Sequence, residues 1–172
     1  ESLLKEMIHA ASETGAKYVK IQDINSNELT FRPRFEKGKI INKKIITIKR
    51  PFENEYERLK KLDMKKNFIS SFIKYCNFYK VIPMITPFTY GSYNRLENKK
   101  VKMIKIASYD CSSYNFLNKI KKLKLPMVVS TGATKKNEII KASKILKKQL
   151  HAFLHCVTIY PTPLEKCNLE ND

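Results

Sequence analysis

The feature of this sequence that most constrains its fold is the regular alternation of short apolar runs with amphipathic segments. Five runs rich in Val and Ile occupy residues 18–22, 81–86, 103–107, 127–130 and 152–157. Runs that are apolar on both faces are typical of strands buried on both sides, as in parallel sheets. The last four recur about every 21 to 25 residues, the length of one strand, loop, helix and loop. We therefore expect five parallel strands that neighbour one another in chain order.

The segments between these runs carry apolar residues at helical spacing, at 3–11, 68–75 and 139–146. Gly15 falls where the first of these helices should end. Alternating helices and buried strands predict an α/β fold, either doubly wound or a (β/α) barrel. The sequence has neither GxGxxG nor GxxxxGK[ST], and only four glycines, which weighs against a nucleotide-binding doubly wound fold.

The length of the chain bounds how much of a barrel it can form. A complete (β/α)8 TIM barrel has eight strands in about 250 residues. Five strands within 172 residues therefore predict a single domain, 1–172, that is either an open α/β fold or a piece of a barrel. Residues 23–66 are too long for an ordinary connection, so we expect an irregular functional excursion at one end of the sheet.

The net charge of +18 comes from 34 basic against 16 acidic residues. All but five of the basic residues are lysines spread over every segment, which favours a solvated surface over a nucleic-acid-binding face rich in arginine. No apolar run approaches the roughly 18 to 20 residues that span a bilayer, and no secretory signal is recognisable. The four cysteines lack CxxC spacing, as is typical of free thiols in a reducing compartment. We expect a cytoplasmic chain with neither nucleic acid nor membrane as a partner.

Polar residues at the carboxyl ends of the expected strands are the candidates for chemistry, because both α/β architectures place their sites there. These residues are Lys20, Gln22, Thr86, Lys105, Ser108, Asp110, Ser130, Thr158 and Tyr160. A lysine within a buried strand is costly unless an anion meets it. Two such lysines, with hydroxyl groups at neighbouring strand ends, predict a site for a small phosphorylated acid.

Each of these residues also has a structural interpretation. Either lysine could be an edge-strand residue whose ammonium reaches water. Ser130 and Asp110 could serve as helix caps, which use the same free N–H groups as phosphate sites. His151 and His155 stand four apart on an expected strand and are more consistent with packing or hydrogen bonding than with a metal site.

Five sequence blocks, in order, make the chain recognisable. They are KYVKIQ at 17–22, TPF at 86–88, KIAS at 105–108, STG at 130–132 and HCVTIYPTP at 155–163. Together they closely resemble the sialic acid synthase family, which comprises N-acetylneuraminate synthase and its legionaminic and pseudaminic acid relatives. The resemblance covers nearly the whole chain and is weakest across 23–66. It implies that the chain is a partial (β/α)8 TIM barrel, whose five strands are the second to sixth of the family's barrel.

The resemblance implies an enzyme that joins phosphoenolpyruvate to an N-acetylated hexose, such as N-acetylmannosamine or a related 6-deoxy sugar, and releases phosphate. It assigns phosphoenolpyruvate binding to Lys20, Thr86, Lys105, Ser108, Ser130 and Thr158, and sugar binding to Gln22, Asp110 and Tyr160. Lys105 and Tyr160 are the expected catalytic residues. A divalent metal, manganese or magnesium, is expected in the full-length enzyme, which the resemblance implies is a homodimer.

The chain departs from the family pattern at three positions. Tyr109-Asp110 replaces a common Gly-Glu, Thr158 replaces an Asn found in some members, and Thr89 stands where Asp is common. These changes bear on the identity of the acceptor sugar more than on the use of phosphoenolpyruvate. The family's first-strand block, its metal-binding histidines, its last strands and its C-terminal antifreeze-like domain have no counterpart in this sequence. We therefore name no metal ligand and expect the 172-residue chain alone to be inactive.

Two other functions remain open on the sequence. The first is a Schiff-base aldolase that uses Lys105 or Lys20 as its nucleophile. The second is a basic nucleic-acid-binding module, whose binding would fall steeply with added salt.

Overall fold

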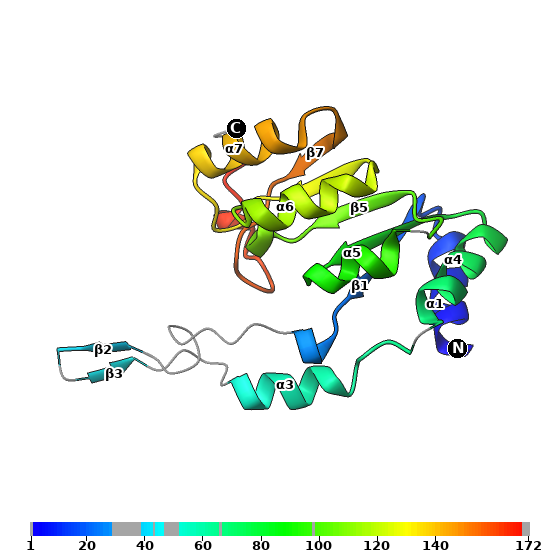
Figure 1. Ribbon diagram of the computed structural model, residues 1–172, viewed down its shortest axis with the longest axis horizontal. Coiled ribbons are helices and arrows are strands. Elements are labelled where there is room, and N and C mark those ends of the chain that lie inside the picture. Colours follow the sequence, from blue (N-terminus) through cyan, green and yellow to red (C-terminus); the bar gives the residue numbers. More distant parts are fainter. Residues whose placement is uncertain are drawn as a thin grey trace.

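The computed structural model describes residues 2–28, 39–42, 44–46, 52–65, 67–97 and 99–169. Its main sheet contains β1 (Tyr18–Asp23), β4 (Ile82–Pro87), β5 (Met103–Ile106), β6 (Met127–Ser130) and β7 (Leu150–Leu154). The strands lie in the order β1-β4-β5-β6-β7, and every neighbouring pair is parallel (Figure 1). The prediction of an α/β fold with five parallel strands in chain order is confirmed.

The larger helices around this sheet are α1 (Ser2–Glu13), α4 (Phe68–Phe78), α5 (Tyr90–Leu96), α6 (Tyr114–Ile120) and α7 (Lys136–Leu146). Short 3-10 helices are η2 (Ser108–Asp110), η3 (Lys121–Leu123), η4 (Lys147–Gln149) and η5 (Leu164–Lys166). Helix α1 ends as expected at Gly15, which has a φ of 78° and donates its N–H to the carbonyl of Ser12 at 3.0 Å. No helix in the described part of the chain is long and apolar enough to cross a membrane.

The hydrophobic core lies between these helices and one face of the sheet. Its buried members include Ile85, Ile104, Ile106, Met127 and Val129 from the strands, and Ile8, Phe72, Leu117 and Leu146 from the helices. Because successive side chains of a strand point to opposite faces, the residues between these core positions point away from the helices. The two faces of the sheet therefore differ in chemistry.

The prediction that all five strands are buried on both sides is wrong for the two outer strands. Strand β6 is buried throughout, whereas β1 alternates between exposed and half-buried positions, with Asp23 buried at its end, and β7 is half-buried or exposed at every position. Strands β1 and β7 are the edges of the sheet, so each has a neighbouring strand on one side only. The last strand also lies earlier than the predicted 152–157, so that His155 and Cys156 follow it.

The excursion at 23–66 is more regular than predicted where the structure describes it. It contains η1 (Ser26–Glu28), α3 (Phe52–Lys60), and the antiparallel pair β2 (Lys39–Ile41) and β3 (Lys44–Ile46), which forms a separate two-stranded sheet (Figure 1). Residues 29–38, 43, 47–51 and 66 of the excursion lie outside the described residues. Asp63, which follows α3, accepts hydrogen bonds from the N–H and the hydroxyl of Ser26 at 2.8 and 2.6 Å, and so ties the end of the excursion to its start.

Candidate functional site

The face of the sheet opposite the core carries most of the predicted site residues from the strands. Lys20 is in register with Met84, Gln22 with Thr86, Ile85 with Ile104, and Lys105 with Val128. In-register neighbours of a parallel sheet point to the same side, and so do residues two apart on one strand. The residues that share this side, here called the open face, are Lys20, Gln22, Thr86, Lys105 and Ser130. The two lysines therefore lie on the same side of the sheet.

The electrostatics of the open face are set by its two lysines. Burial lowers the pKa of Lys20 below its usual value, and the charge of Lys105 lowers it further. Burial also lowers the pKa of Lys105, while the nearby Cys156 thiol acts in the opposite direction. Among the residues that the structure describes, neither ammonium has an ion-pair partner. An anion bound between the two lysines would relieve both the desolvation and the repulsion.

Two hydroxyl groups on the open face are buried without a partner. Thr86 and Ser130 are 1% and 2% exposed, and in the described part of the chain neither side-chain oxygen has a hydrogen-bond partner. A buried polar group left unpaired costs about 1 to 3 kcal/mol. Unsatisfied hydroxyls beside two unpaired ammonium groups are typical of a ligand site that is complete only when its ligand is bound.

The ends of the last three strands are packed closely together. The N–H of Gly132, which follows β6, donates to the hydroxyl of Ser108, which follows β5, at 3.1 Å. A Cβ at Gly132 would lie 3.1 Å from that hydroxyl and 3.2 Å from the Cβ of Cys156, which follows β7. A side chain at Gly132 would therefore require its neighbours to shift by a few tenths of an ångström, and the hydrogen bond to Gly132 ties Ser108 to the loop that follows Ser130.

The remaining predicted residues lie after the strands. Asp110 is 5% exposed in η2. Thr158 is exposed and Tyr160 is fully exposed, beyond the end of β7. Among the described residues, no hydrogen bond joins either side chain to another group. Their proposed contacts with substrate stay predictions.

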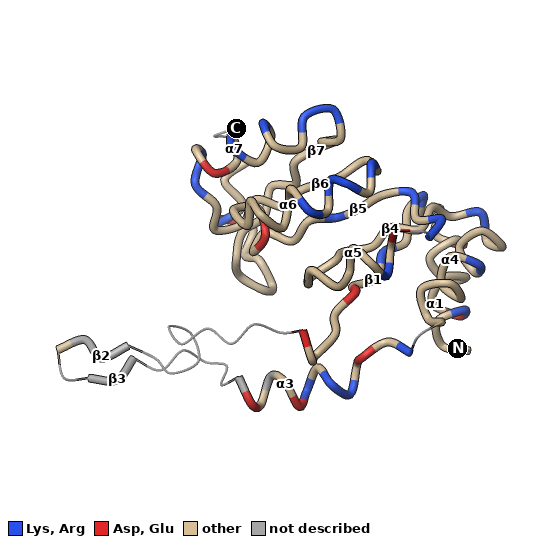
Figure 2. The backbone as a smooth tube through the Cα atoms, in the orientation of Figure 1, with Lys and Arg blue, Asp and Glu red and all other residues tan. Residues whose placement is uncertain are grey.

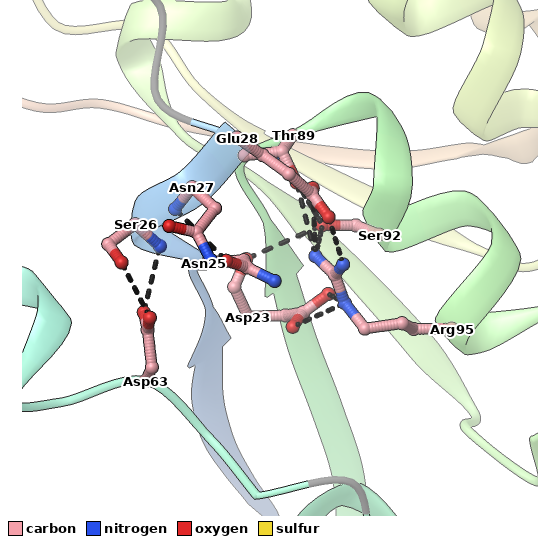
Figure 3. A network of polar contacts seen from close by, with 9 residues as sticks. All are labelled: Asp23, Asn25, Ser26, Asn27, Glu28, Asp63, Thr89, Ser92 and Arg95. Atoms are coloured by element: carbon pink, nitrogen blue, oxygen red, sulfur yellow. Dashed lines mark hydrogen bonds and ion pairs between the residues drawn. The ribbon is translucent and has the colours of Figure 1, made fainter.

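Sequence reasoning missed a second polar site, which we call the Arg95 cluster. Its members are Asp23, Glu28, Thr89, Ser92 and Arg95 (Figure 3). Its guanidinium pairs with Asp23 at 3.1 Å and with Glu28 at 2.5 Å. The hydrogen bond from Arg95 is the main cause that lowers the pKa of Glu28. Two signals could have pointed to it: Arg95 is one of few arginines in a lysine-rich chain, and Asp23 directly follows Gln22.

Neither a metal site nor a single basic stripe stands out in the described residues. No three His, Cys, Asp or Glu side chains there are grouped so that they could hold a metal ion. Figure 2 shows basic residues along α1, α4 and α7 and in the loop before β7, rather than on one element. The open face instead offers ammonium and hydroxyl groups, which suit an anion.

Comparison with known proteins agrees with this geometry. The sequence model of the NeuB family matches residues 7–171, which is nearly the whole chain. The chain belongs to the NeuB family. Among its relatives, the N,N'-diacetyllegionaminic acid synthase of Campylobacter jejuni is 28% identical over 98% of this chain and 51% of the relative. A pseudaminic acid synthase of the same organism is 30% identical over 95% of this chain and 47% of the relative.

Solved structures extend the comparison to the fold. The N-acetylneuraminic acid synthetase of Leptospira borgpetersenii, crystallised with citrate, superposes with a TM-score of 0.76 and 27% identity over 97% of this chain and 53% of that one. A truncated 3-deoxy-D-arabino-heptulosonate 7-phosphate synthase of Thermotoga maritima matches at a TM-score of 0.58 and 10% identity, over 90% of this chain and 45% of that one, and so indicates fold alone. This NeuB-family chain is thus part of a TIM-barrel fold, and it spans about half the length of its relatives.

Proposed function

We propose that the whole protein containing this chain condenses phosphoenolpyruvate with an N-acetylated hexose and water, giving a nonulosonic acid and phosphate. The observation that carries the proposal is the open face of a NeuB-family member, where two lysines and two buried hydroxyls lie on one side of the sheet without a partner among the described residues. The likeness to legionaminic and pseudaminic acid synthases supports the reaction class. The acceptor sugar, N-acetylmannosamine or a 6-deoxy relative, is part of the proposal.

The open face supplies the groups that a phosphorylated carboxylic acid needs. Lys20 and Lys105 neutralise the phosphate and carboxylate, and Thr86, Ser108, Ser130 and Thr158 donate hydroxyl hydrogen bonds to their oxygens. Charge-assisted hydrogen bonds of this kind are about twice as strong as neutral ones. A bound anion also favours the charged form of both lysines and so opposes the lowering of their pKa values. Lys105 acts in catalysis by stabilising the phosphate that departs.

The acceptor sugar lies at the carboxyl end of the sheet in this proposal. Gln22 ends the open face on β1, Asp110 follows β5 and Tyr160 follows β7. Carbon 3 of phosphoenolpyruvate attacks the aldehyde carbon of the open-chain sugar, and water adds to carbon 2. The resulting tetrahedral intermediate expels phosphate as the bond between carbon 2 and the phosphate oxygen breaks. In this proposal Tyr160 contacts the sugar. Since the described residues hold no metal group, we propose that the ligands of manganese or magnesium come from other parts of the whole protein.

The test of the function is phosphate released from phosphoenolpyruvate by the whole protein. We expect release only when N-acetylmannosamine or a 6-deoxy relative is also present, with a nonulosonic acid detected by mass spectrometry in equal amount. Assays with and without manganese test whether phosphate release requires a divalent metal. Phosphate released equally with and without sugar would identify a phosphatase and reject the synthase.

One observation favours a second function, a Schiff-base aldolase. Desolvation and a neighbouring cation lower the pKa of a lysine and so increase the neutral, nucleophilic fraction, and both act on Lys20. Borohydride reduction in the presence of a carbonyl substrate traps such an imine as a stable adduct. We expect no adduct from the synthase, whereas an adduct at Lys20 or Lys105 would favour the aldolase.

We also propose that the 172-residue chain alone is inactive as a synthase and that the whole protein is a homodimer. In the isolated chain Lys20 and Gln22 of the open face are exposed to water, and the edges of β1 and β7 have no further strand among the described residues. Electrostatic stabilisation depends on a site that excludes water, and losing one such interaction costs about 100- to 1000-fold in rate. Phosphate release by the isolated chain, and the mass of the whole protein in solution, test the two statements.

A further inference from the structure

The Arg95 cluster lies where β1 ends and α5 begins. The Arg95 guanidinium donates from Nε to both oxygens of Asp23 at 3.1 Å and from Nη1 to Glu28 at 2.5 Å (Figure 3). From Nη2 it also donates to the hydroxyl of Thr89 at 3.1 Å. One planar cation thus joins two carboxylates that are five residues apart in sequence, which is a geometry that lysine cannot reproduce.

The cluster fixes the carboxyl end of β1. Asp23 is 2% exposed, and its carbonyl accepts hydrogen bonds from the N–H of Phe88 at 3.2 Å and the hydroxyl of Ser92 at 3.4 Å. Both the side chain and the backbone of Asp23 are therefore held from β4 and α5. Gln22 directly precedes Asp23, so its backbone position depends on these contacts.

The cluster also fixes the segment that leaves β1. The Glu28 carboxylate accepts hydrogen bonds from Arg95 and Thr89 and lies against Gly91, where an added Cβ would overlap its oxygens. At the other side of this segment, Ser26 is held by Asp63. Residues 24–28 are thus anchored at both sides, directly beyond the end of the open face.

Lys20 does not depend on these contacts in the same way. It lies within β1 and is held by the strand ladder, in register with Met84. Lys105 is on β5, with β4 between it and β1. A change at Arg95 would therefore move Gln22 and the segment after it more than it would move either lysine.

We propose that the Arg95 cluster is a positioning clamp that sets the affinity and selectivity for the acceptor sugar, and not for phosphoenolpyruvate. The proposal rests on the proposed function, in which Gln22 contacts the sugar. Arg95 is a positioning residue that acts through Asp23 and Glu28. Its half-buried guanidinium already meets the carboxylates of Asp23 and Glu28, so we expect no direct contact with substrate.

The test compares Michaelis constants in the whole protein, with N-acetylmannosamine and a 6-deoxy relative as acceptors. We expect Arg95→Met to raise the KM of the preferred sugar about tenfold, with the KM of phosphoenolpyruvate changed by less than about twofold. Arg95→Lys keeps the charge but cannot bridge both carboxylates, so we expect an intermediate KM. Asn94→Ala, an exposed neighbour on α5, is the matched control and should leave both constants unchanged.

A second variant separates positioning from folding. Gly91→Ala places a methyl group against the Glu28 carboxylate, which is the mobile end of its side chain and can move without unfolding the protein. We expect it to raise the sugar KM alone, with an unchanged melting temperature. Equal changes in both Michaelis constants, or no change in either, for Gly91→Ala and Arg95→Met would overturn the clamp. A wild-type protein without sugar-dependent phosphate release would instead reject the proposed function, and the clamp with it.

Discussion

Two charged groups of residues lie at neighbouring places on the same sheet, and they differ in how far their polar atoms are satisfied. On the open face, Lys20 and Lys105 have no ion pair among the described residues, and the hydroxyls of Thr86 and Ser130 have no hydrogen bond. In the Arg95 cluster, by contrast, the guanidinium meets two carboxylates and two hydroxyls. The two regions are joined through consecutive residues of β1.

The difference shows how to tell a binding surface from a structural network. A network whose donors and acceptors are all paired has little to gain from a ligand, and its contribution is to hold backbone in place. Unpaired cations and hydroxyls destabilise the free protein, because buried polar groups without partners cost free energy. A ligand that pairs with them removes this cost and therefore binds more tightly. This contrast predicts that substitutions on the open face alter substrate binding and turnover. Substitutions in the Arg95 cluster should instead alter the position of the backbone at the end of β1.

The largest expected effect is the loss of turnover when Lys105 is replaced. In the whole protein, Lys105→Met should lower kcat for phosphate release by at least about a hundredfold, because the departing phosphate loses its cation. Lys105→Arg should fail nearly as badly, since the guanidinium does not fit a site shaped for an ammonium. The control is Lys102→Met, at an exposed lysine that directly precedes β5. A Lys105→Met protein with normal turnover would show that the open face does not perform the chemistry.

The next effect concerns the unpartnered hydroxyls. We expect Ser130→Ala and Thr86→Val to raise the KM of phosphoenolpyruvate about tenfold, as one charge-assisted hydrogen bond is lost. Without ligand, the free energy of unfolding should stay equal or increase by about 1 kcal/mol, because an unpaired buried group is removed. Thr131→Val is the control, since its hydroxyl already donates to the carbonyl of Leu154 and its loss should destabilise. Destabilisation of the first two variants in urea would mean that their hydroxyls are paired in the free protein.

A smaller effect is expected on the stability of the ligand-free protein. Lys105→Met should raise the melting temperature by about 2 to 4 °C for each kcal/mol of relieved desolvation and repulsion. The folded pKa of this lysine is lowered, so at alkaline pH the unfolded chain binds more protons and wild-type stability rises with pH. The advantage of the variant should therefore be full at pH 7 and disappear as the pH rises through the folded pKa towards 10.5.

The control for that measurement is phosphate. Added phosphate should raise the melting temperature of the wild type and leave that of Lys105→Met almost unchanged. An equal rise in both proteins would show that the anion binds elsewhere.

The smallest effect belongs to the paired cluster. The folded pKa of Glu28 lies below 4.5, so its contribution to stability is complete above the unfolded pKa and is lost as the pH falls through the folded one. Glu28→Gln should cost about 1 kcal/mol at pH 7 and almost nothing once the wild-type carboxylate is protonated. Urea unfolding at pH 7 and at a pH below the folded pKa of Glu28 measures this difference in the free energy of unfolding. The control is Glu6→Gln, at an exposed position. A loss that is independent of pH would mean that packing, and not charge, holds the segment.

Much of the fold followed from the sequence, and the errors have a common cause. The apolar runs located all five strands, because burial against helices requires Val and Ile wherever the sheet lies. Sequence pattern could not show that β1 and β7 are edges, since an edge strand and a central strand can have the same composition. It placed the last strand too late because Cys156 and Val157 continue the apolar run beyond Leu154, where β7 ends.

The candidate site divides in the same way. By itself the sequence determined that lysines and hydroxyls stand at strand ends, because strand periodicity fixes which side of the sheet each residue faces. Only the tertiary structure decided that Arg95 meets Asp23 and Glu28, because these residues are 72 and 67 positions apart in sequence. Local periodicity carries no information on which distant side chains a turn of α5 brings together. That pairing depends on β1 lying beside β4 in the parallel sheet, with α5 following β4, and so it is visible only in three dimensions.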